Sequence, residues 1–307
     1  MRAIRQHDFG GPEVLRYEEV PDPAPGDGQV VIAVEASGVH LVDTTIRKGE
    51  PFGPVGVAEL PMTPGREVAG RVVEGDEGWI GRRVVVHLGF ANGGYAERAV
   101  ADVAALHEVP DGVDGAEAVA MIGTGRTAML LLGSAEIRPD DVVLVTSAAG
   151  GLGSLFVQAV NNAAATAIGL ASASKLDVVA GLGAVPIDYT DPGWAKLVDR
   201  TPTLVLDGVG GDVGRAAVTL LGPGGRVVRF GWSSGEPTPL EGLEERGITT
   251  RVLERPDDLR PLEDASMAAL ASGALRPLVT RFRLAEAAVA HEALEDRRTT
   301  GKVVLVS

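Results

Sequence analysis

The stretch VLVTSAAGGLGSLFVQAV constrains the fold of this chain more than any other segment. Val142 to Val145 form an apolar, β-branched run that is typical of a buried strand, and the residues after the turn have the apolar spacing of a helix. Between them, Ala148, Gly150 and Gly153 stand at the spacing of the small residues in GxGxxG. Such a turn lets backbone N–H groups and the helix dipole meet an anionic pyrophosphate. The motif alone fits an ordinary βα turn equally well, but the order of strand, turn and helix favours a dinucleotide site.

Composition and charge exclude several other classes of protein. A length of 307 residues, with 45% hydrophobic and 23% charged residues, indicates a globular chain with room for two domains. The absence of cysteine excludes disulfides, a thiolate nucleophile and a sulfur-ligated zinc site. A formal net charge of −14 opposes binding to nucleic acid or to an anionic membrane. Because no run of about eighteen apolar residues occurs, and because the N-terminal segment is charged, we expect a soluble cytoplasmic protein that acts on a small molecule.

Three segments with different residue patterns predict an α/β protein with two domains. Up to about residue 115, short β-type runs alternate with Pro/Gly turns, which suggests a compact barrel-like domain. Residues 116–249 alternate helical segments with apolar strands, the pattern of βαβ units and a parallel sheet. The remaining tail is too short for a domain of its own. We therefore assign residues 1–115 and 250–307 to one domain and residues 116–249 to the other.

The expected elements follow from the same patterns. The strands of the first part are expected at 14–20, 29–36, 67–74, 83–87 and 95–100. The parallel strands are expected at 142–145, 167–170, 204–206 and 227–230. The tail is expected to contain helices at 262–271 and 284–294 and a terminal strand at 303–306.

Several pieces of the sequence, taken in order, resemble the quinone oxidoreductase (ζ-crystallin-like) branch of the medium-chain dehydrogenase/reductase superfamily. The pieces are GVHLVDTTIRKG, PMTPGREVAG, GGYAERAV, GRTAMLLL, SAAGGLGSLFVQA, LDGVGG, FGWSSG and LEDRRTTGKVVLV. The resemblance implies a GroES-like, β-rich catalytic domain made from both ends of the chain, with a Rossmann domain, a doubly wound parallel sheet, inserted between them. It also implies NADPH-linked reduction of quinones or other activated double bonds, and a homodimer, which no pattern in the sequence itself reports.

The end of the second strand of the Rossmann unit indicates which dinucleotide is bound. A NAD site usually carries Asp or Glu here, which accepts from the ribose 2′-OH and would repel a 2′-phosphate. This chain instead has Ser172, Ser174 and Lys175, with no acid before Asp177. Hydroxyl groups and an ammonium suit a phosphate and favour NADPH, while a serine that only caps the next helix is the alternative. In the resembled family, the lysine and tyrosine that match Lys175 and Tyr189 lie beside the adenosine phosphate.

The remaining cofactor contacts are expected at strand ends and in flanking helices. Thr127 matches a threonine that approaches the nicotinamide in the resembled family. Val209 follows one parallel strand, and Gly231 and Trp232 follow the next, where doubly wound sheets hold ligands, although such glycines also shape turns. Arg297 matches an arginine near the phosphates and fits a solvated helix end equally well. The expected cofactor-binding residues are Thr127, Ala149, Gly150, Gly151, Leu152, Gly153, Ser172, Lys175, Tyr189, Val209, Gly231, Trp232 and Arg297.

The zinc alcohol dehydrogenases of the same superfamily provide a test for a metal. Their first cysteine ligand matches His40, their histidine ligand matches Arg66, and a third ligand would lie near Ile122 or Gly123. A guanidinium cannot ligate a metal, and its charge would repel one. We therefore expect no metal site and a hydride transfer that is assisted by hydrogen bonds.

Without a metal, side-chain donors have to stabilise the charge that develops on the acceptor oxygen. His40, Thr45 and Arg47 lie in the loop that resembles the family's substrate-binding stretch and are the catalytic candidates. His40 replaces a common asparagine and Thr45 a common tyrosine, but an imidazole still donates a hydrogen bond and can protonate an enolate near neutral pH. A histidine satisfied in a packed loop is an equally good interpretation of His40. Glu67 is expected to fix the loop rather than to act as a base.

These features favour an NADPH-dependent reductase, similar to quinone oxidoreductases, that transfers a hydride without a metal to a quinone or another conjugated carbonyl. An enoyl or alkenal reductase, which acts on acyclic conjugated carbonyls, is a close alternative. A noncatalytic NADPH-binding module is the alternative from a different class of protein. His40, Thr45 and Trp232 mark the positions where the substrate class is expected to depart from that of the family.

Overall fold

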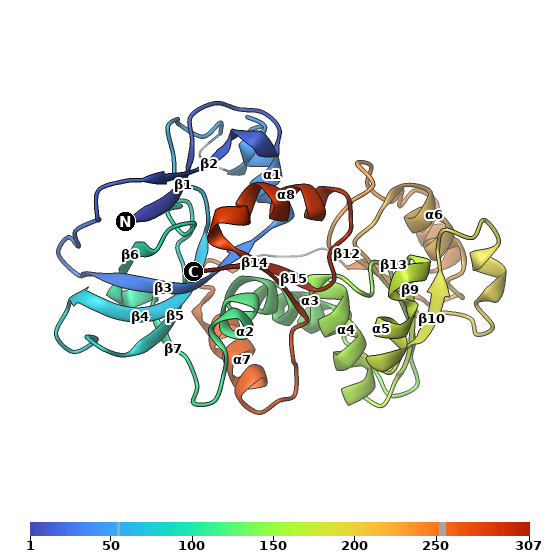
Figure 1. Cartoon of the computed structure of the whole chain (residues 1–307). Coiled ribbons are helices and arrows are strands. Elements are labelled where there is room, and N and C mark those ends of the chain that lie inside the picture. Colours follow the sequence, from blue (N-terminus) through green and yellow to red (C-terminus); the bar gives the residue numbers. More distant parts are fainter. Residues whose placement is uncertain (54–55, 252–255) are drawn as a thin grey trace. The chain divides into compact units, whose positions relative to one another are not determined.

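The computed structural model describes residues 1–53, 56–251 and 256–307. Within these ranges the chain forms two compact units (Figure 1). Unit 1 contains Met1–Thr124 and Pro277–Ser307, and unit 2 contains Gly125–Arg276. Each unit has its own sheet and its own hydrophobic core.

Unit 1 is built on a β-sheet whose strands come from both ends of the chain. Among the described residues, the sheet contains β3 (Gln29–Val39), β4 (Glu67–Gly75), β5 (Arg83–His87), β6 (Arg98–Asp102), β7 (His107–Glu108), β14 (Val279–Arg283) and β15 (Lys302–Val306). The strands run in the order β14-β15-β3-β4-β5-β7, with β6 paired to β3. Neighbours are antiparallel except for the parallel pair β14 and β15. A separate two-stranded sheet pairs β1 (Arg2–Gln6) with β2 (Leu15–Glu19).

Apolar side chains of the central strands form the core of unit 1. Val30 and Ile32 of β3 pack with Val68 of β4, as the two-residue period of a strand requires. The C-terminal strand completes this sheet, because Val303 of β15 lies opposite Val39 of β3. In Figure 1 the red strand β15 accordingly lies beside the blue strand β3. The β-rich fold expected from the sequence is therefore made from both ends of the chain.

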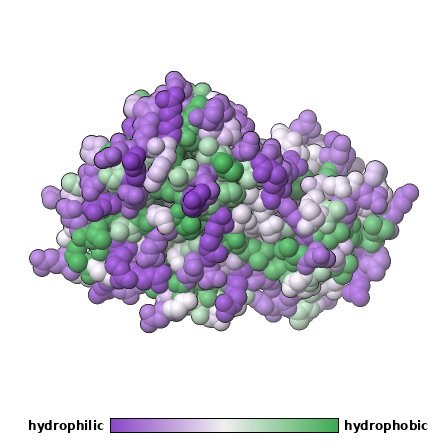
Figure 2. Space-filling view, in the orientation of Figure 1, coloured by the Kyte–Doolittle hydropathy of each residue, from purple (hydrophilic) through white to green (hydrophobic). Residues whose placement is uncertain are grey.

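The α-helices described in unit 1 are α1 (Leu41–Arg47), α2 (Gly115–Ala120) and α8 (Ala287–Glu295). A π-helical turn, Met121–Gly125, joins α2 to α3 (Arg126–Ala135) of unit 2. Among the described residues, this continuous segment, Gly115–Ala135, is the one helix long and apolar enough to span a membrane by length and composition. Of its apolar window, 61% is buried inside the protein, as in a core helix. Figure 2 shows hydrophilic residues around the outline of the visible face, with hydrophobic residues between them.

Unit 2 contains a parallel sheet. Its six described strands are β8 (Val142–Val145), β9 (Thr166–Ala171), β10 (Val185–Asp188), β11 (Leu204–Asp207), β12 (Arg226–Arg229) and β13 (Thr249–Arg251). They lie in the order β10-β9-β8-β11-β12-β13, and each neighbouring pair is parallel. Counted from β8, this is the order 3-2-1-4-5-6 of a doubly wound Rossmann sheet. The predicted α/β fold class is confirmed.

Unit 2 extends further along the chain than the sequence indicated. Besides α3, its helices are α4 (Gly151–Asn162), α5 (Leu176–Gly181), α6 (Gly211–Thr219) and α7 (Arg260–Ala271). Helix α7, which we had expected in the other domain, packs against α3, and Arg126 Nη1 lies 2.7 Å from Glu263 Oε1. The unit boundaries follow Thr124 and Arg276 rather than residues 115 and 249. The change of residue pattern near residue 250 marks the end of the alternation of strands and helices. The unit to which α7 belongs depends instead on the helix that it packs against.

The carboxyl ends of β8 and β11 meet where the strand order reverses. Asp207, fully buried at the end of β11, accepts a hydrogen bond of 2.7 Å from Thr146 Oγ1. The same carboxylate accepts from the backbone N–H groups of Val209 and Gly210 and from Thr238 Oγ1. Ligands of open α/β sheets bind outside the strand ends at this reversal. Asp207 therefore fixes the loops that border the expected ligand position.

Replacement of Asp207 tests this role. Asp207→Ala leaves two buried hydroxyl groups and two N–H groups without their acceptor, so we expect a loss of about 3 kcal/mol or more in the free energy of unfolding. Asp207→Asn, which keeps one acceptor oxygen, should lose less. Urea denaturation measures both variants, and Asp199→Ala, at an exposed position of unit 2, serves as the control with a change of about 0.5 kcal/mol or less. Equal effects of Asp207→Ala and Asp199→Ala would contradict the role.

Candidate active site

His40, Glu67 and Lys302 form a charged cluster at one end of the sheet of unit 1. His40 follows β3, Glu67 begins β4 and Lys302 begins β15, and the pairing of β3 with both other strands brings the three side chains together. His40 Nε2 lies 2.7 Å from Glu67 Oε1 and 2.8 Å from Lys302 Nζ, and Lys302 Nζ lies 3.1 Å from Glu67 Oε2. Glu67 is fully buried and Lys302 is 5% exposed, whereas 21% of the His40 side chain is exposed. The cluster thus leads from the interior of unit 1 to its surface.

Two glycines make room for the buried carboxylate of Glu67. A Cβ atom at Gly38 of β3 would overlap one carboxylate oxygen, and a Cβ atom at Gly123 of the π-helical turn would overlap the other. Both positions therefore need glycine while Glu67 keeps this conformation. The sequence comparison had connected the Gly123 position with a metal ligand in zinc enzymes, and here that position borders a carboxylate.

The charge states of the cluster follow from its geometry. Burial would raise the pKa of Glu67, but the adjacent His40 and Lys302 hold it well below the usual range. Burial lowers the pKa of Lys302, and the attraction to Glu67 opposes this shift. The two groups therefore stabilise each other as a carboxylate and an ammonium, and His40 Nε2 lies between the two charges.

This donor set does not fit a zinc ion. The Lys302 ammonium lies 2.8 Å from His40 Nε2, the nitrogen that contacts the cluster, and Arg66 stands where the zinc enzymes have a histidine ligand. A metal cation at this position would meet a lysine and an arginine, neither of which supplies a lone pair at neutral pH. Within residues 1–53, 56–251 and 256–307, no group of three or more His, Cys, Asp or Glu side chains is placed to hold a metal.

A second network anchors α1, the helix that His40 caps. The backbone N–H of His40 donates to Asp43 Oδ2 at 2.8 Å, and Tyr95 Oη donates to the same oxygen at 3.1 Å. Tyr95 also lies 3.2 Å from His291 Nε2 of α8, and the two rings meet edge to face with centroids 5.8 Å apart. Burial raises the pKa of the Tyr95 hydroxyl well above its ordinary value, with the Asp43 carboxylate adding to the shift. Tyr95 therefore stays a hydroxyl donor to Asp43.

Arg47 completes this network at the other end of α1. Its guanidinium lies 3.2 Å from His291 Nδ1, and Nη2 donates to both oxygens of Glu295 at 3.1 and 2.9 Å. Its Nε donates to Gly10 O at 3.0 Å. The side chain is 1% exposed. Arg47 was predicted to be catalytic, but these contacts favour an anchoring role. Thr45 is half-buried in the same helix, and its predicted contact with the acceptor stays a prediction.

In unit 2, the glycine turn takes the form that a dinucleotide needs. Gly150 caps α4 in an extended conformation, without a side-chain cap, so the first N–H groups of the helix, at Gly151, Leu152 and Gly153, have no side-chain acceptor. A Cβ atom at Gly153 would overlap the backbone of Ser147, and one at Gly150 would lie 2.9 Å from Ser147 Oγ. Ala149 is buried beside them. The turn presents open N–H groups at a helix N-terminus, which is a binding site for an anion.

Ser172, Lys175 and Tyr189 gather at the carboxyl ends of β9 and β10. Ser172 directly follows β9, and the N–H of Tyr189, which follows β10, donates to Ala171 O at 3.1 Å. Lys175 ends the short 3₁₀ turn that Ser172 begins. All three side chains are half-buried. Ser172 makes no cap hydrogen bond to the turn, so the purely capping interpretation is not supported.

The other predicted cofactor residues lie in several places. Val209 is buried after β11, and the N–H of Ser234 donates to its carbonyl oxygen, which joins the loops after β11 and β12. Gly231 and Trp232 belong to the second of these loops, and the Trp232 side chain is 60% exposed. Thr127 is half-buried in the first turn of α3. Arg297 lies in unit 1, exposed, with a φ of 56° at the end of α8, and its cofactor contact stays a prediction.

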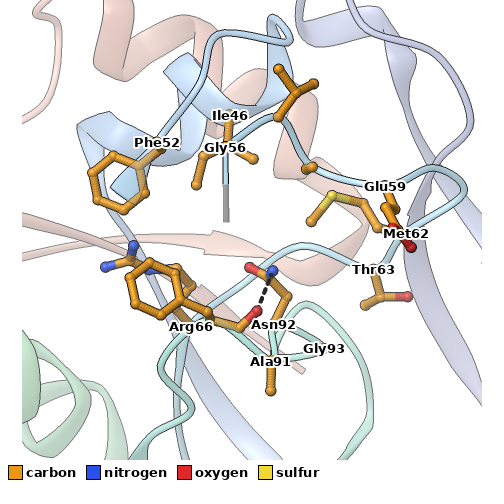
Figure 3. A pocket seen from close by; sticks show the side chains of 13 residues that line it. Ile46, Phe52, Gly56, Glu59, Met62, Thr63, Arg66, Ala91, Asn92 and Gly93 are labelled. Carbon is orange, nitrogen blue, oxygen red and sulfur yellow. Dashed lines mark hydrogen bonds between the residues drawn. The ribbon is translucent and has the colours of Figure 1, made fainter. Parts of the chain in front are cut away.

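A cavity of about 550 Å³ opens in unit 1 near the end of α1. Its apolar lining includes Ile46, Phe52, Met62 and Phe90, and Arg66 is its one positively charged residue among those described (Figure 3). The volume is within the range of small-molecule sites. Neither this cavity nor the roles of Lys302 and Asp207 were predicted. The sequence signal that could have indicated Lys302 is its place as the one charged residue at the start of the apolar terminal strand KVVLV.

Together these features define a class of protein, a two-unit pyridine-nucleotide oxidoreductase with a β-rich unit and a Rossmann unit. Residues 26–111 match the family model described as "Alcohol dehydrogenase GroES-like domain", and residues 182–305 match the one described as "Zinc-binding dehydrogenase". Both models belong to the medium-chain dehydrogenase/reductase superfamily. The second description names zinc, but the groups around His40 do not fit a zinc ion.

Similar proteins narrow the class to a family. The chain is 33% identical to a quinone oxidoreductase of Pseudomonas aeruginosa, with 99% of both chains covered, and 30% identical to a 2-haloacrylate reductase of Burkholderia sp., with 98% and 97% covered. The crystal structure of the Escherichia coli quinone oxidoreductase complexed with NADPH matches with a TM-score of 0.85 and 28% identity over 100% of both chains. The chain belongs to the quinone oxidoreductase family of the medium-chain dehydrogenase/reductase superfamily. It is an oxidoreductase, and the predicted resemblance is confirmed.

The anchor of α1 predicts a dependence of stability on pH. Burial lowers the pKa of His291 from 6.5 to about 4, so between these values the unfolded chain binds a proton that the folded chain does not. The free energy of unfolding therefore falls as the pH decreases from 6.5 to 4, by about 3 kcal/mol for this residue. His291→Gln keeps an acceptor for Arg47 and a donor for Tyr95 but does not titrate.

Urea denaturation at several pH values between 4 and 7 measures the effect. The difference in unfolding free energy between the native protein and His291→Gln should shrink as the pH falls, by about 3 kcal/mol over the whole range. His7→Gln, at a partly exposed histidine paired with Glu18, is the control and should change by about 1 kcal/mol or less. Parallel curves for the native protein and His291→Gln would show that His291 is not a buried neutral residue.

Proposed function

We propose that this oxidoreductase uses NADPH to reduce a quinone or another conjugated carbonyl compound, with hydrogen bonds in place of a metal. The cluster of His40, Glu67 and Lys302 is the observation that carries the proposal. In it, a buried ion pair holds a partly exposed imidazole, that of His40, whose position in the sequence matches a metal ligand of the zinc enzymes. Two relatives named as quinone oxidoreductases, from Pseudomonas aeruginosa and Escherichia coli, support the acceptor class.

Unit 2 would hold the cofactor. The open N–H groups at Gly151, Leu152 and Gly153 suit the pyrophosphate, and the hydroxyl groups and ammonium of Ser172, Tyr189 and Lys175 suit a 2′-phosphate. The absence of a carboxylate directly after β9 favours NADPH over NADH. When bound, the nicotinamide supplies a hydride.

The residues of unit 1 would supply a proton and stabilise the negative charge that develops on the acceptor. Lys302 Nζ donates to His40 Nε2, and this contact fixes the imidazole with its proton on Nδ1, the nitrogen available to the reduced acceptor. Lys302 keeps Glu67 ionised, so the carboxylate does not take the proton of the imidazole. Asp43 holds the backbone of His40, and Arg47 holds the helix that follows. In this proposal Arg47 positions the loop and His40 contacts the acceptor.

A panel of acceptors tests the proposal and its two alternatives. We expect the purified protein to oxidise NADPH, followed at its absorbance maximum, with benzoquinone or naphthoquinone. Activity with 2-alkenals alone would reject the quinone assignment and favour an alkenal reductase. Tight NADPH binding without turnover of any quinone or alkenal would favour a noncatalytic NADPH-binding module. His40→Phe, which removes both ring nitrogens, should lower kcat by about a hundredfold or more if the imidazole acts as a general acid.

Lys175→Ala tests the cofactor assignment. Loss of a charge-assisted contact to the 2′-phosphate should weaken NADPH binding by about tenfold or more. NADH lacks this phosphate, so its binding should change little. Lys196→Ala, at an exposed lysine of the same unit, is the matched control. Isothermal titration with both cofactors gives the result, and equal losses for NADPH and NADH would remove Lys175 from the phosphate site.

The homodimer and the cytoplasmic location stay predictions, and light scattering of the purified protein tests the first.

A further inference from the structure

The cavity of unit 1 contains a cation without an anionic partner. Arg66 lines the cavity, and its guanidinium carbon lies 5.1 Å from the centroid of the Phe52 ring. Its Nε atom is buried and has no hydrogen-bond partner. Throughout the described parts of the chain, no carboxylate lies within ion-pair distance of Arg66: Glu67 is held by His40 and Lys302, and Figure 3 places Glu59 on the other side of the cavity.

The guanidinium is held in place by the groups around it. The carbonyl oxygen of Arg66 accepts a hydrogen bond of 2.7 Å from the N–H of Leu88, which fixes the backbone just before β4. The ring of Phe52, itself 6.2 Å from that of Phe90, supports one face of the guanidinium. A planar guanidinium that is stacked in this way keeps its N–H edge for a carboxylate, which it binds with two parallel hydrogen bonds.

The surroundings favour an anionic ligand over a neutral one. An unpaired cation beside apolar side chains loses hydration without a compensating partner, and a carboxylate that enters the cavity supplies that partner. Ile46, Met62 and the two phenylalanine rings offer an apolar surface for the rest of the ligand. Figure 3 shows the side chains of Ile46, Phe52, Met62 and Arg66 around one cavity.

We propose that the acceptor of this enzyme is a conjugated unsaturated acid, whose carboxylate binds Arg66 while its hydrocarbon part contacts Phe52 and the other apolar residues. This inference rests on the proposed function. In the reaction, the β-carbon gains a hydride from NADPH and the C=C π bond breaks, so its electron pair moves toward the α-carbon and the carboxylate. The α-carbon then gains a proton, and the products are the saturated acid and NADP⁺. The guanidinium stabilises the extra charge on the carboxylate oxygens.

A matched pair of unreactive probes tests the binding step alone. 3-Phenylpropanoate carries the carboxylate, and 3-phenylpropanamide has nearly the same shape without the charge. By ligand-observed NMR titration, the native protein should bind the acid about tenfold or more tightly than the amide. The preference should vanish in Arg66→Gln and return in part in Arg66→Lys. Arg16→Gln, at an exposed arginine of β2 in the same unit, should keep it.

The outcomes separate this inference from the proposed function. Equal binding of acid and amide by the native protein overturns the inference, whether or not the variants fold. An acid preference that persists in folded Arg66→Gln, checked by circular dichroism, also overturns it. The acid preference together with its loss in Arg66→Gln supports Arg66 as the carboxylate site even if no acceptor oxidises NADPH, which would reject the proposed function alone. Turnover of cinnamate, with a KM that rises about tenfold in Arg66→Gln, supports both.

Discussion

A buried carboxylate on β4, that of Glu67, is the constraint on which unit 1 depends. A charge that is fully removed from water is tolerated only when an opposite charge and hydrogen bonds compensate it. Lys302 supplies that charge from the last strand of the chain and His40 supplies the second contact, while Gly38 and Gly123 leave the space that the carboxylate occupies. The ion pair therefore depends on the pairing of β15 with β3, and a side chain encoded near the C-terminus determines the surroundings of the first catalytic candidate.

The same constraint explains why hydrogen bonds replace a metal in the proposed chemistry. Arg66 stands at the sequence position that matches a histidine ligand of the zinc enzymes, and His40 contacts the ammonium of Lys302. The network of Asp43, Tyr95 and His291 then holds the helix that His40 caps. Neutral His291 is essential to this network, because a protonated ring would face the Arg47 guanidinium. The imidazole of His40 is thus fixed from two sides, by the ion pair and by its own backbone.

The sequence predicted the parts of the fold that local patterns specify. Strand β5 and strand β8 were predicted with the observed bounds, and the glycine turn was placed correctly, because apolar runs and glycine spacing are local. Strands β1, β10 and β14 were missed, since their mixed residues pair only in the folded sheet. Partnerships between distant residues were equally inaccessible: the pairing of Arg47 with Glu295, 248 positions away, favours an anchoring role that no local pattern indicated. Glu67 was expected to fix its loop, and it contacts His40 there, but its second partner Lys302 was not foreseen.

The coupling between Glu67 and Lys302 is the central claim, and a double-mutant cycle measures it directly. Urea denaturation of Glu67→Gln, Lys302→Met and the double variant gives the three free energies of unfolding. Each single variant should lose about 3 kcal/mol or more, because it leaves a buried group without its partner, and the double variant should lose much less than the sum. Additive losses, within about 0.5 kcal/mol, would mean that the two charges do not depend on each other and would contradict the account.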